Sequence, residues 1–303
     1  MTLRIGTRAS ALARWQAEHI QQLLRRAWPA LETALVPMTT TGDRILDRPL
    51  ADIGGKGLFV KELEHAMLAG EIDIAVHSLK DMPTEQPPGL LLDVVIPRAS
   101  AFDVLCGREE AYRVDTLPQG ASVGTGSQRR MAQLRRARPD LKLVPLRGNV
   151  QTRLEKRHSE SLDAIVLAEA GLRRLGIWES TFKVIDASVM LPAPGQGAIV
   201  VERRADDARL AELLAPLRCD RSAFAIEAER ACLRAVGGDC HTPFAAWASL
   251  DEEGWTLHGR LFRGEGYAMT RATRTDTRDI FVAHALGEEV ASALLRDLQQ
   301  QGT

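Results

Sequence analysis

The sequence predicts an α/β protein of two similar domains around a cleft, followed by a small α+β domain. The strand–turn–helix pattern that opens the chain occurs again, in the same order, in its middle part, which indicates a duplicated α/β unit. From about Cys219 onward the pattern changes to one helix, several short strands and a final helix. The predicted domains are residues 1–98 with 199–217, residues 99–198, and residues 218–303.

The first domain is predicted to begin with a strand, a turn and a helix. After the strand Leu3–Ile5, apolar residues follow at helical spacing from Leu12 to Ala27, with Ser10 as the N-cap. Because long loops in compact domains are often lids, we expect a mobile flap over Gly42–Gly57. The other elements predicted here are a strand at Ala34–Met38, a helix at Phe59–Leu68 and a strand at Ile72–Val76.

Three short segments of the second domain repeat segments of the first. Each match is short, and their shared order is what indicates two domains of similar build. The matches are Ser122–Ser127 with Ile5–Ser10, Leu143–Asn149 with Leu35–Thr41, and Leu162–Leu167 with Ile72–His77.

The Pro/Gly-rich segment Leu191–Ala198 is predicted to return the chain to the first domain, where Ile199–Glu202 forms a strand. Such a twice-crossed pair of α/β domains is typical of periplasmic-binding-protein-like folds. The elements expected afterwards are a helix at Asp206–Leu217, a helix at Phe224–Ala235, strands around Trp247, Trp255 and Tyr267, and a helix at Thr277–Gln299.

Composition excludes several classes of protein. The chain of 303 residues has 45% hydrophobic and 26% charged residues, with a net charge of −1, so a nucleic-acid partner is not expected. No apolar run is long enough to span a membrane, and the N-terminal residues are too polar for a signal peptide. We therefore expect a cytoplasmic protein. The seven histidines and four cysteines form no HxxxH or CxxC pair, and no metal site is expected.

Basic and hydroxyl side chains gather at the ends of the predicted strands. Any one of these arginines can be an ordinary surface residue, but as a set at equivalent strand ends they predict binding of several carboxylates or phosphates. They are Arg8, Ser10 and Lys80 in the first domain, and Ser127, Arg129, Arg130, Arg147, Arg153 and Arg174 in the second.

Two glycine motifs are not nucleotide sites. Gly54–Gly57 lacks the Ser or Thr and the upstream Gly of a phosphate-binding loop, and Arg129 stands where a dinucleotide fingerprint needs its third glycine.

Asp81, just after the strand that ends near His77, is a candidate acid/base group. His77 itself is expected to be structural or to act behind the site.

Cys240 differs from the other cysteines because two glycines and an aspartate precede it in a loop. A reactive or modified thiol and a plain packing residue both fit this pattern. A metal site with Cys232 and His241 is weaker, since no fourth ligand is evident. Cys106, Cys219 and Cys232 are expected to be inert packing residues.

Seven ordered motifs carry a resemblance that covers essentially the whole chain. The sequence resembles the porphobilinogen deaminase (hydroxymethylbilane synthase) family. The matching motifs are Gly6–Ala13, Gly54–Glu64, Ala75–Pro83, Gly124–Arg130, Arg147–Leu154, Leu191–Ala198 and Gly238–Pro243.

This resemblance implies a monomeric transferase of tetrapyrrole and heme biosynthesis, which joins four porphobilinogens into hydroxymethylbilane and releases ammonia. It implies a dipyrromethane cofactor in thioether linkage to Cys240, and Asp81 as the catalytic carboxylate. The cofactor-binding residues implied are Lys80, Ser127, Arg129, Arg130, Arg153 and Asp43. The substrate-binding residues implied are Arg8, Ser10, Arg147 and Arg174, with Lys56 and Phe59 at the end of the flap.

The sequence departs from the family pattern at Asp239, which replaces a glycine before the cysteine, and at Asp52, where many relatives have Lys. The chemistry fits the residues: arginines neutralise carboxylates, and a buried Asp81 stabilises the azafulvenium cation left when ammonia departs. The alternative is a non-catalytic two-domain anion-binding protein, which the duplicated halves alone would also support.

Overall fold

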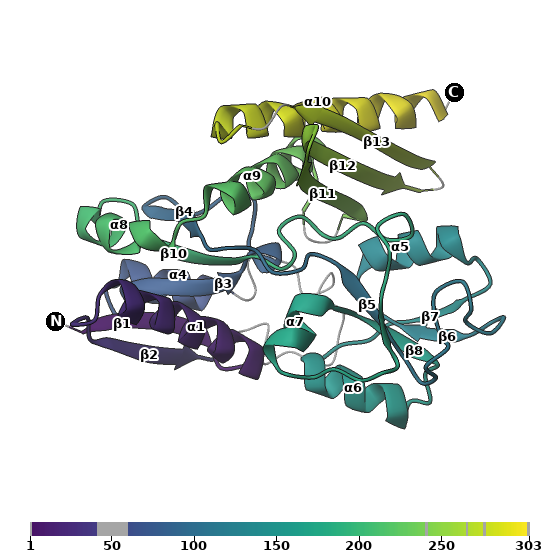
Figure 1. Ribbon diagram of the computed structural model, residues 1–303, viewed down its shortest axis with the longest axis horizontal. Coiled ribbons are helices and arrows are strands. Elements are labelled where there is room, and N and C mark those ends of the chain that lie inside the picture. Colours follow the sequence, from purple (N-terminus) through teal and green to yellow (C-terminus); the bar gives the residue numbers. More distant parts are fainter. Residues whose placement is uncertain (1, 41–59, 240–241, 265, 275–276, 302–303) are drawn as a thin grey trace. The chain divides into compact units, whose positions relative to one another are not determined.

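The computed structural model describes residues 2–40, 60–239, 242–264, 266–274 and 277–301 (Figure 1). By its internal contacts the chain divides into two compact units, and each is described by itself. The first unit is Met1–Arg98 with Ala198–Ala223, and the second is Ala99–Gly197 with Phe224–Thr303. The three domain boundaries expected from the sequence, and the cleft between the first two domains, stay predictions.

The first unit contains a five-stranded sheet of order β2-β1-β3-β10-β4. Strand β1 runs parallel to β2 and β3, whereas β10 runs antiparallel to β3 and β4. Helix α1 packs in one core cluster of the unit and α4 in another. The elements are β1 (Leu3–Arg8), α1 (Ala11–Ala27), β2 (Thr33–Met38), α4 (Lys61–Leu68), β3 (Ile74–Ser78), the 3₁₀ turn η1 (Leu79–Asp81), β4 (Leu90–Val95), β10 (Ile199–Arg204), α8 (Ala208–Leu214) and η2 (Ala215–Leu217).

The larger sheet of the second unit repeats this topology, with order β7-β6-β8-β5-β9 and the same strand directions. The predicted duplication is therefore confirmed, because β6, β7 and β8 are the three segments matched to β1, β2 and β3. Its elements are β5 (Asp103–Gly107), β6 (Ser122–Gly124), α5 (Gln128–Ala137), β7 (Lys142–Val144), α6 (Val150–Ser159), β8 (Ala164–Ala168), α7 (Glu169–Arg174) and β9 (Phe182–Val184).

The chain crosses between the two five-stranded sheets twice, first between β4 and β5 and then over Leu191–Ala198 before β10. Strand β10 follows the crossing Leu191–Ala198 and pairs with β3 and β4 in the sheet of the first unit. Glycines allow the close packing beside the central strands. A Cβ on Gly6 would lie 2.4 Å from Cδ1 of Ile72, and one on Gly124 would lie 2.8 Å from Cδ1 of Leu162.

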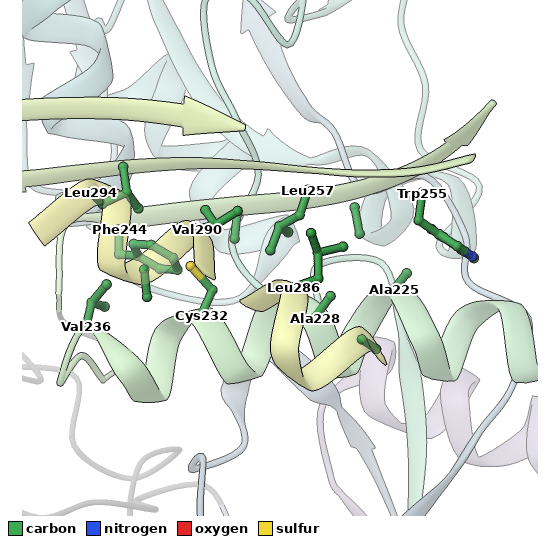
Figure 2. Close-up of a cluster of buried hydrophobic side chains, with 14 of the residues drawn as sticks. Ala225, Ala228, Cys232, Val236, Phe244, Trp255, Leu257, Leu286, Val290 and Leu294 are labelled. Carbon is green, nitrogen blue, oxygen red and sulfur yellow. The ribbon is translucent and has the colours of Figure 1, made fainter. Parts of the chain in front are cut away.

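The second unit also contains a three-stranded antiparallel sheet of order β11-β12-β13 with two helices. Apolar side chains of these elements form one core cluster (Figure 2). Helices α9 and α10 pack so closely that a Cβ on Gly287 would lie 2.5 Å from the carbonyl oxygen of Ala228. The elements are α9 (Asp220–Ala235), β11 (Phe244–Asp251), β12 (Gly254–Arg263), β13 (Gly266–Arg274) and α10 (Ile280–Gln301).

Some predicted helix boundaries are wrong. The single helix expected over Asp206–Leu217 is instead α8 followed by a 3₁₀ turn that contains Pro216, because proline has no N–H for the α-helical ladder. The final helix begins at Ile280 rather than Thr277, where the Asp279 carboxylate accepts a hydrogen bond from the Phe281 N–H at 2.9 Å.

Candidate functional site

A pocket in the first unit lies where β1 and β3 end and α1 begins. Its empty volume, open mouth included, is about 420 Å³. Arg8 is the last residue of β1, and Ser10 caps α1 by accepting a hydrogen bond from the Ala13 N–H at 3.3 Å. Asp81 ends the 3₁₀ turn that follows β3. The polar residues that line the pocket are Arg8, Ser10, Gln16, His77, Ser78 and Asp81.

The structure thus brings together three residues that the sequence singled out, namely Arg8, Ser10 and Asp81. Asp81 is exposed at the pocket, contrary to the expectation of a buried carboxylate. The reason is that Asp81 ends a short turn beyond the edge of the sheet rather than a strand inside it. Lys80, half-buried in the same turn, is not among the lining residues.

Sequence reasoning missed two polar residues here, namely Gln16, which lines the pocket, and Glu202, which contacts His77 from behind it. The Gln16 side-chain amide donates to the Ser78 hydroxyl at 2.7 Å, which ties α1 to the end of β3. Nε2 of His77 lies 3.0 Å from a carboxylate oxygen of Glu202, and both side chains are buried. The available signal for Glu202 was a charged residue that directly follows the apolar run of β10.

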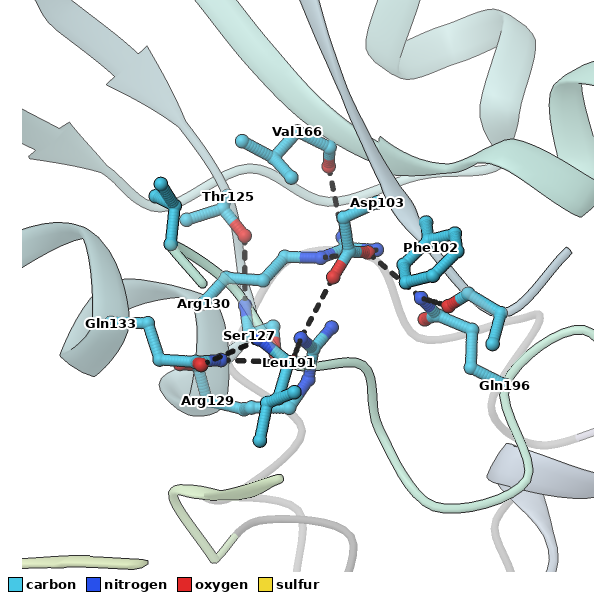
Figure 3. A network of polar contacts seen from close by, with 12 residues as sticks. Phe102, Asp103, Thr125, Ser127, Arg129, Arg130, Gln133, Val166, Leu191 and Gln196 are labelled. Carbon is cyan, nitrogen blue, oxygen red and sulfur yellow. Dashed lines mark hydrogen bonds and ion pairs between the residues drawn. The ribbon is translucent and has the colours of Figure 1, made fainter. Parts of the chain in front are cut away.

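In the second unit, two adjacent arginines in the first turn of α5 share one buried carboxylate (Figure 3). Nη1 of Arg129 donates to Asp103 at 2.8 Å, and Nη2 of Arg130 donates to it at 2.6 Å. Burial alone would raise the pKa of Asp103, but the charges of the two guanidinium groups outweigh it and hold that pKa well below its usual range. Asp103 was not foreseen, because it lies at the start of an apolar strand.

The same network reaches both chain crossings. The Gln196 amide donates to Asp103 at 3.0 Å and to the carbonyl of Ala101 at 2.6 Å. Arg129 also donates to the carbonyl of Leu191 at 2.6 Å. Figure 3 shows the side chains of Arg129, Arg130 and Gln196 converging on Asp103. The arginines of α5 are therefore held in fixed orientations before any ligand arrives.

Buried guanidinium N–H groups remain without a partner. Nε of Arg129 and Nη1 of Arg147 are buried and have no hydrogen-bond acceptor among the residues that the structure describes. An unsatisfied buried donor is costly, typically by about 1–3 kcal/mol. These two N–H groups can therefore donate hydrogen bonds to a ligand that carries carboxylates.

The remaining predicted arginines of this unit are partly engaged with backbone carbonyls. Nε of Arg153 donates to Gly148 at 2.7 Å, and Nη2 of Arg174 donates to Gly197 at 2.7 Å. Burial lowers the pKa of Arg174 to about 10, so its guanidinium stays charged at neutral pH. Ser127 is the N-cap residue of α5 and makes no side-chain capping bond there.

Comparison with known proteins identifies the family. The model described as "Porphobilinogen deaminase, dipyromethane cofactor binding domain" matches residues 3–212, and that described as "Porphobilinogen deaminase, C-terminal domain" matches residues 223–296. The chain belongs to the porphobilinogen deaminase family.

Curated relatives resemble the chain over nearly its full length. Porphobilinogen deaminase of Xanthomonas campestris pv. campestris is 50% identical over 305 residues, which cover 98% of this chain and 99% of that protein. The protein of the same name from Syntrophotalea carbinolica is 49% identical over 296 residues, 97% of this chain and 92% of that one. Among solved structures, the periplasmic VFT2 domain of Bordetella pertussis BvgS matches 71% of this chain and 86% of its own, at 15% identity and a TM-score of 0.43.

Several family positions lie outside the described residues, namely Cys240, Asp43, Asp52, Lys56 and Phe59. Asp239, which departs from the family pattern, lies within the described residues. Its carboxylate accepts hydrogen bonds from the N–H of Thr242 at 3.1 Å and from its hydroxyl at 3.2 Å. The Asp239 N–H donates back to that hydroxyl at 2.9 Å. A glycine could not make the two carboxylate contacts.

The described cysteines are free thiols. Burial raises the pKa of Cys106 to about 12 and also raises that of Cys232, so neither is a ready nucleophile. Within the described parts of the chain, no group of three or more His, Cys, Asp or Glu side chains is placed to hold a metal ion. No helix found there has the length and apolar character needed to cross a membrane.

We predict that Asp103→Asn lowers the free energy of unfolding at pH 7 by about 3–5 kcal/mol, because two buried guanidinium groups lose their carboxylate. The depressed pKa of Asp103 makes its contribution complete above about pH 4, the ordinary aspartate value, and lost as the pH falls further. Urea unfolding should therefore show a smaller difference from the wild type at pH 3 than at pH 7. The exposed Asp115→Asn serves as the control, and an equal loss at both pH values would contradict the charge argument.

Proposed function

We propose that this protein joins four porphobilinogen molecules head to tail into the linear tetrapyrrole hydroxymethylbilane and releases ammonia. The proposal rests on family membership over nearly the whole chain. Two buried guanidinium donors have no partner among the described residues, and one of them is on Arg129 in the network around Asp103; both support the proposal. An alternative role as a non-catalytic anion-binding protein has no such family support.

The arginines predicted to bind substrate carry the opposite charge to the substrate. Porphobilinogen bears two carboxylates, so negative charge accumulates as the chain of pyrroles grows. Because guanidinium binds carboxylate through a planar fork of N–H donors, we assign substrate carboxylates to Arg8, Arg147 and Arg174, with the Ser10 hydroxyl as a further donor. Arg8 and Ser10 already line one pocket.

The residues present also fit the dipyrromethane group of the family, which carries carboxylates as well. Nε of Arg129 is a buried donor that a carboxylate would satisfy. We propose that Arg129, Arg130, Arg153, Lys80, Ser127 and Asp43 hold this group and that Cys240 bears it as a thioether. When bound, it supplies a tethered acceptor pyrrole, which makes each addition effectively intramolecular.

Asp81 is proposed as the catalytic carboxylate. It ends the turn after β3 and faces the pocket that also contains Arg8 and Ser10. A carboxylate there stabilises the cation that remains on the substrate when ammonia departs, and it accepts or returns a proton during the new carbon–carbon bond formation. The flap residues Lys56 and Phe59 are proposed to border this site.

We further propose a monomeric protein of the cytoplasm, without nucleic-acid or membrane partners. The near-neutral net charge of −1 gives no basis for nucleic-acid binding. Free thiols at Cys106, Cys219 and Cys232 fit a reducing compartment.

The cofactor proposal predicts an adduct of dipyrromethane mass on Cys240 in protein from cells that make porphobilinogen. Intact-protein and peptide mass spectrometry would measure the adduct and its position. Cys240→Ser is the control and should lack the added mass. A folded wild-type protein without the adduct would overturn the proposal.

Asp81→Asn should lower kcat by about 10²–10⁴-fold while the adduct remains, because the carboxylate acts on the reacting groups rather than on cofactor attachment. Steady-state release of ammonia and mass spectrometry would measure the two effects. The matched control Asp206→Asn changes an exposed carboxylate of the same unit and should leave kcat unchanged. Near-normal turnover in Asp81→Asn would remove Asp81 from the catalytic role.

Arg147→Leu should raise KM or lower the adduct-bearing fraction by about tenfold or more, since a charge-assisted hydrogen bond is lost. It is a cleaner test than Arg129→Leu, because Arg129 is also bonded to Asp103 and its loss would disturb the fold. Arg135→Leu, an exposed position on α5, is the matched control. Unchanged kinetics and loading in Arg147→Leu would contradict the carboxylate assignment.

A further inference from the structure

Three buried ionisable side chains of the first unit are electrostatically coupled, and one of them lines the pocket. His77 is 5% exposed and lines the pocket, Glu202 is fully buried, and Glu64 of α4 is 8% exposed. The His77 imidazole contacts one oxygen of the Glu202 carboxylate, and the other oxygen is buried without a partner among the described residues. Burying a carboxylate oxygen without a hydrogen-bond partner costs stability.

The fold itself does not require these ionisable groups. In β3 and β10, His77 pairs in register with Val200, and Ala75 with Glu202. The equivalent pairs of the second unit are Leu167 with Val104 and Ile165 with Cys106. His77 and Glu202 therefore take the places of Leu167 and Cys106, which are buried members of one apolar core cluster.

The net charge of His77, Glu202 and Glu64 depends on how many protons the three side chains hold. Two carboxyl groups and one imidazole are electrically neutral together when they hold two of three possible protons. Burial raises the pKa of Glu64, and the charge of Glu202 raises it further, whereas His77, His65 and Lys61 oppose the shift. The raised pKa favours the protonated form of the buried Glu64.

We infer that His77, Glu202 and Glu64 form a proton store for the pocket, with His77 as the member that gives protons to it and takes them from it. The inference rests on the proposed function. The carbon–nitrogen bond of the substrate breaks as the amine receives a proton and leaves as ammonia. The proton released from the acceptor pyrrole carbon, when the new carbon–carbon bond forms, returns through Asp81 to the store, so no other reactant is consumed.

The most direct test replaces His77 and Glu202 by the residues at the equivalent positions of the second unit. His77→Leu with Glu202→Cys should fold with at least the urea midpoint of the wild type, because the buried ions are replaced by side chains that the same framework already packs. It should retain the adduct on Cys240 but lose kcat by about tenfold or more. A folded, loaded double variant with wild-type kcat would overturn the inference.

Two single variants keep the test open if the double variant does not fold. Glu202→Gln should move the alkaline limb of kcat to lower pH by about one unit or more, because the imidazolium loses its counter-charge. Glu64→Gln should leave that limb nearly in place, because it replaces a protonated carboxyl group by a neutral amide. Glu71→Gln, exposed just beyond α4, is the control and should not shift it. A wild-type pH profile in Glu202→Gln would also overturn the inference.

Infrared spectroscopy separates this inference from the proposed function. The wild type should show the band of a protonated carboxyl group that is absent in Glu64→Gln, whether or not porphobilinogen is consumed. Absence of that band would refute the store. Its presence in a protein that releases no ammonia from porphobilinogen would refute the proposed function while the cluster stands.

Discussion

The second unit depends on one fully buried carboxylate. Asp103 lies at the start of β5 and receives hydrogen bonds from Arg129, Arg130 and Gln196. It thus joins the first turn of α5 to both chain crossings, because β5 follows the first and Gln196 belongs to the second. Among the described residues, Asp103 is the carboxylate with which these guanidinium groups pair, so one positive charge is left over. The interaction that orients the arginines therefore also leaves them attractive to an anion.

The two sheets share one framework but place polar side chains at different positions of it. Asp103 pairs in register with Ala168, and Ile199 takes the corresponding place opposite Ser78. Conversely, the positions of His77 and Glu202 are occupied by Leu167 and Cys106 in the second unit. Neither polar cluster is needed to form the sheet, because each has an apolar counterpart in the other unit.

Local pattern was enough to predict the duplicated sheets and part of the pocket. The turn after β1 and the turn after β3 are readable from glycine, proline and polar residues within a few positions, which is why Arg8, Ser10 and Asp81 were found. Asp103 and Glu202 were not, because their partners are 26 and 125 residues away and strand register decides which face they share. Helix ends were missed for a related reason, since the Asp279 cap and the 3₁₀ turn at Pro216 are decided by single residues.

The distribution of these clusters separates two tasks that the proposed reaction sets. Binding a growing polyanion needs fixed positive charge, and Arg129 and Arg130 supply it at a position that a single carboxylate cannot neutralise. Handling protons needs groups that change charge, and arginine does not do so near neutral pH. The pair of His77 and Glu202 on the equivalent strands of the first unit consists instead of an imidazole and a carboxyl group in contact. Duplication followed by different polar substitution in each copy thus gives one fold two distinct electrostatic environments.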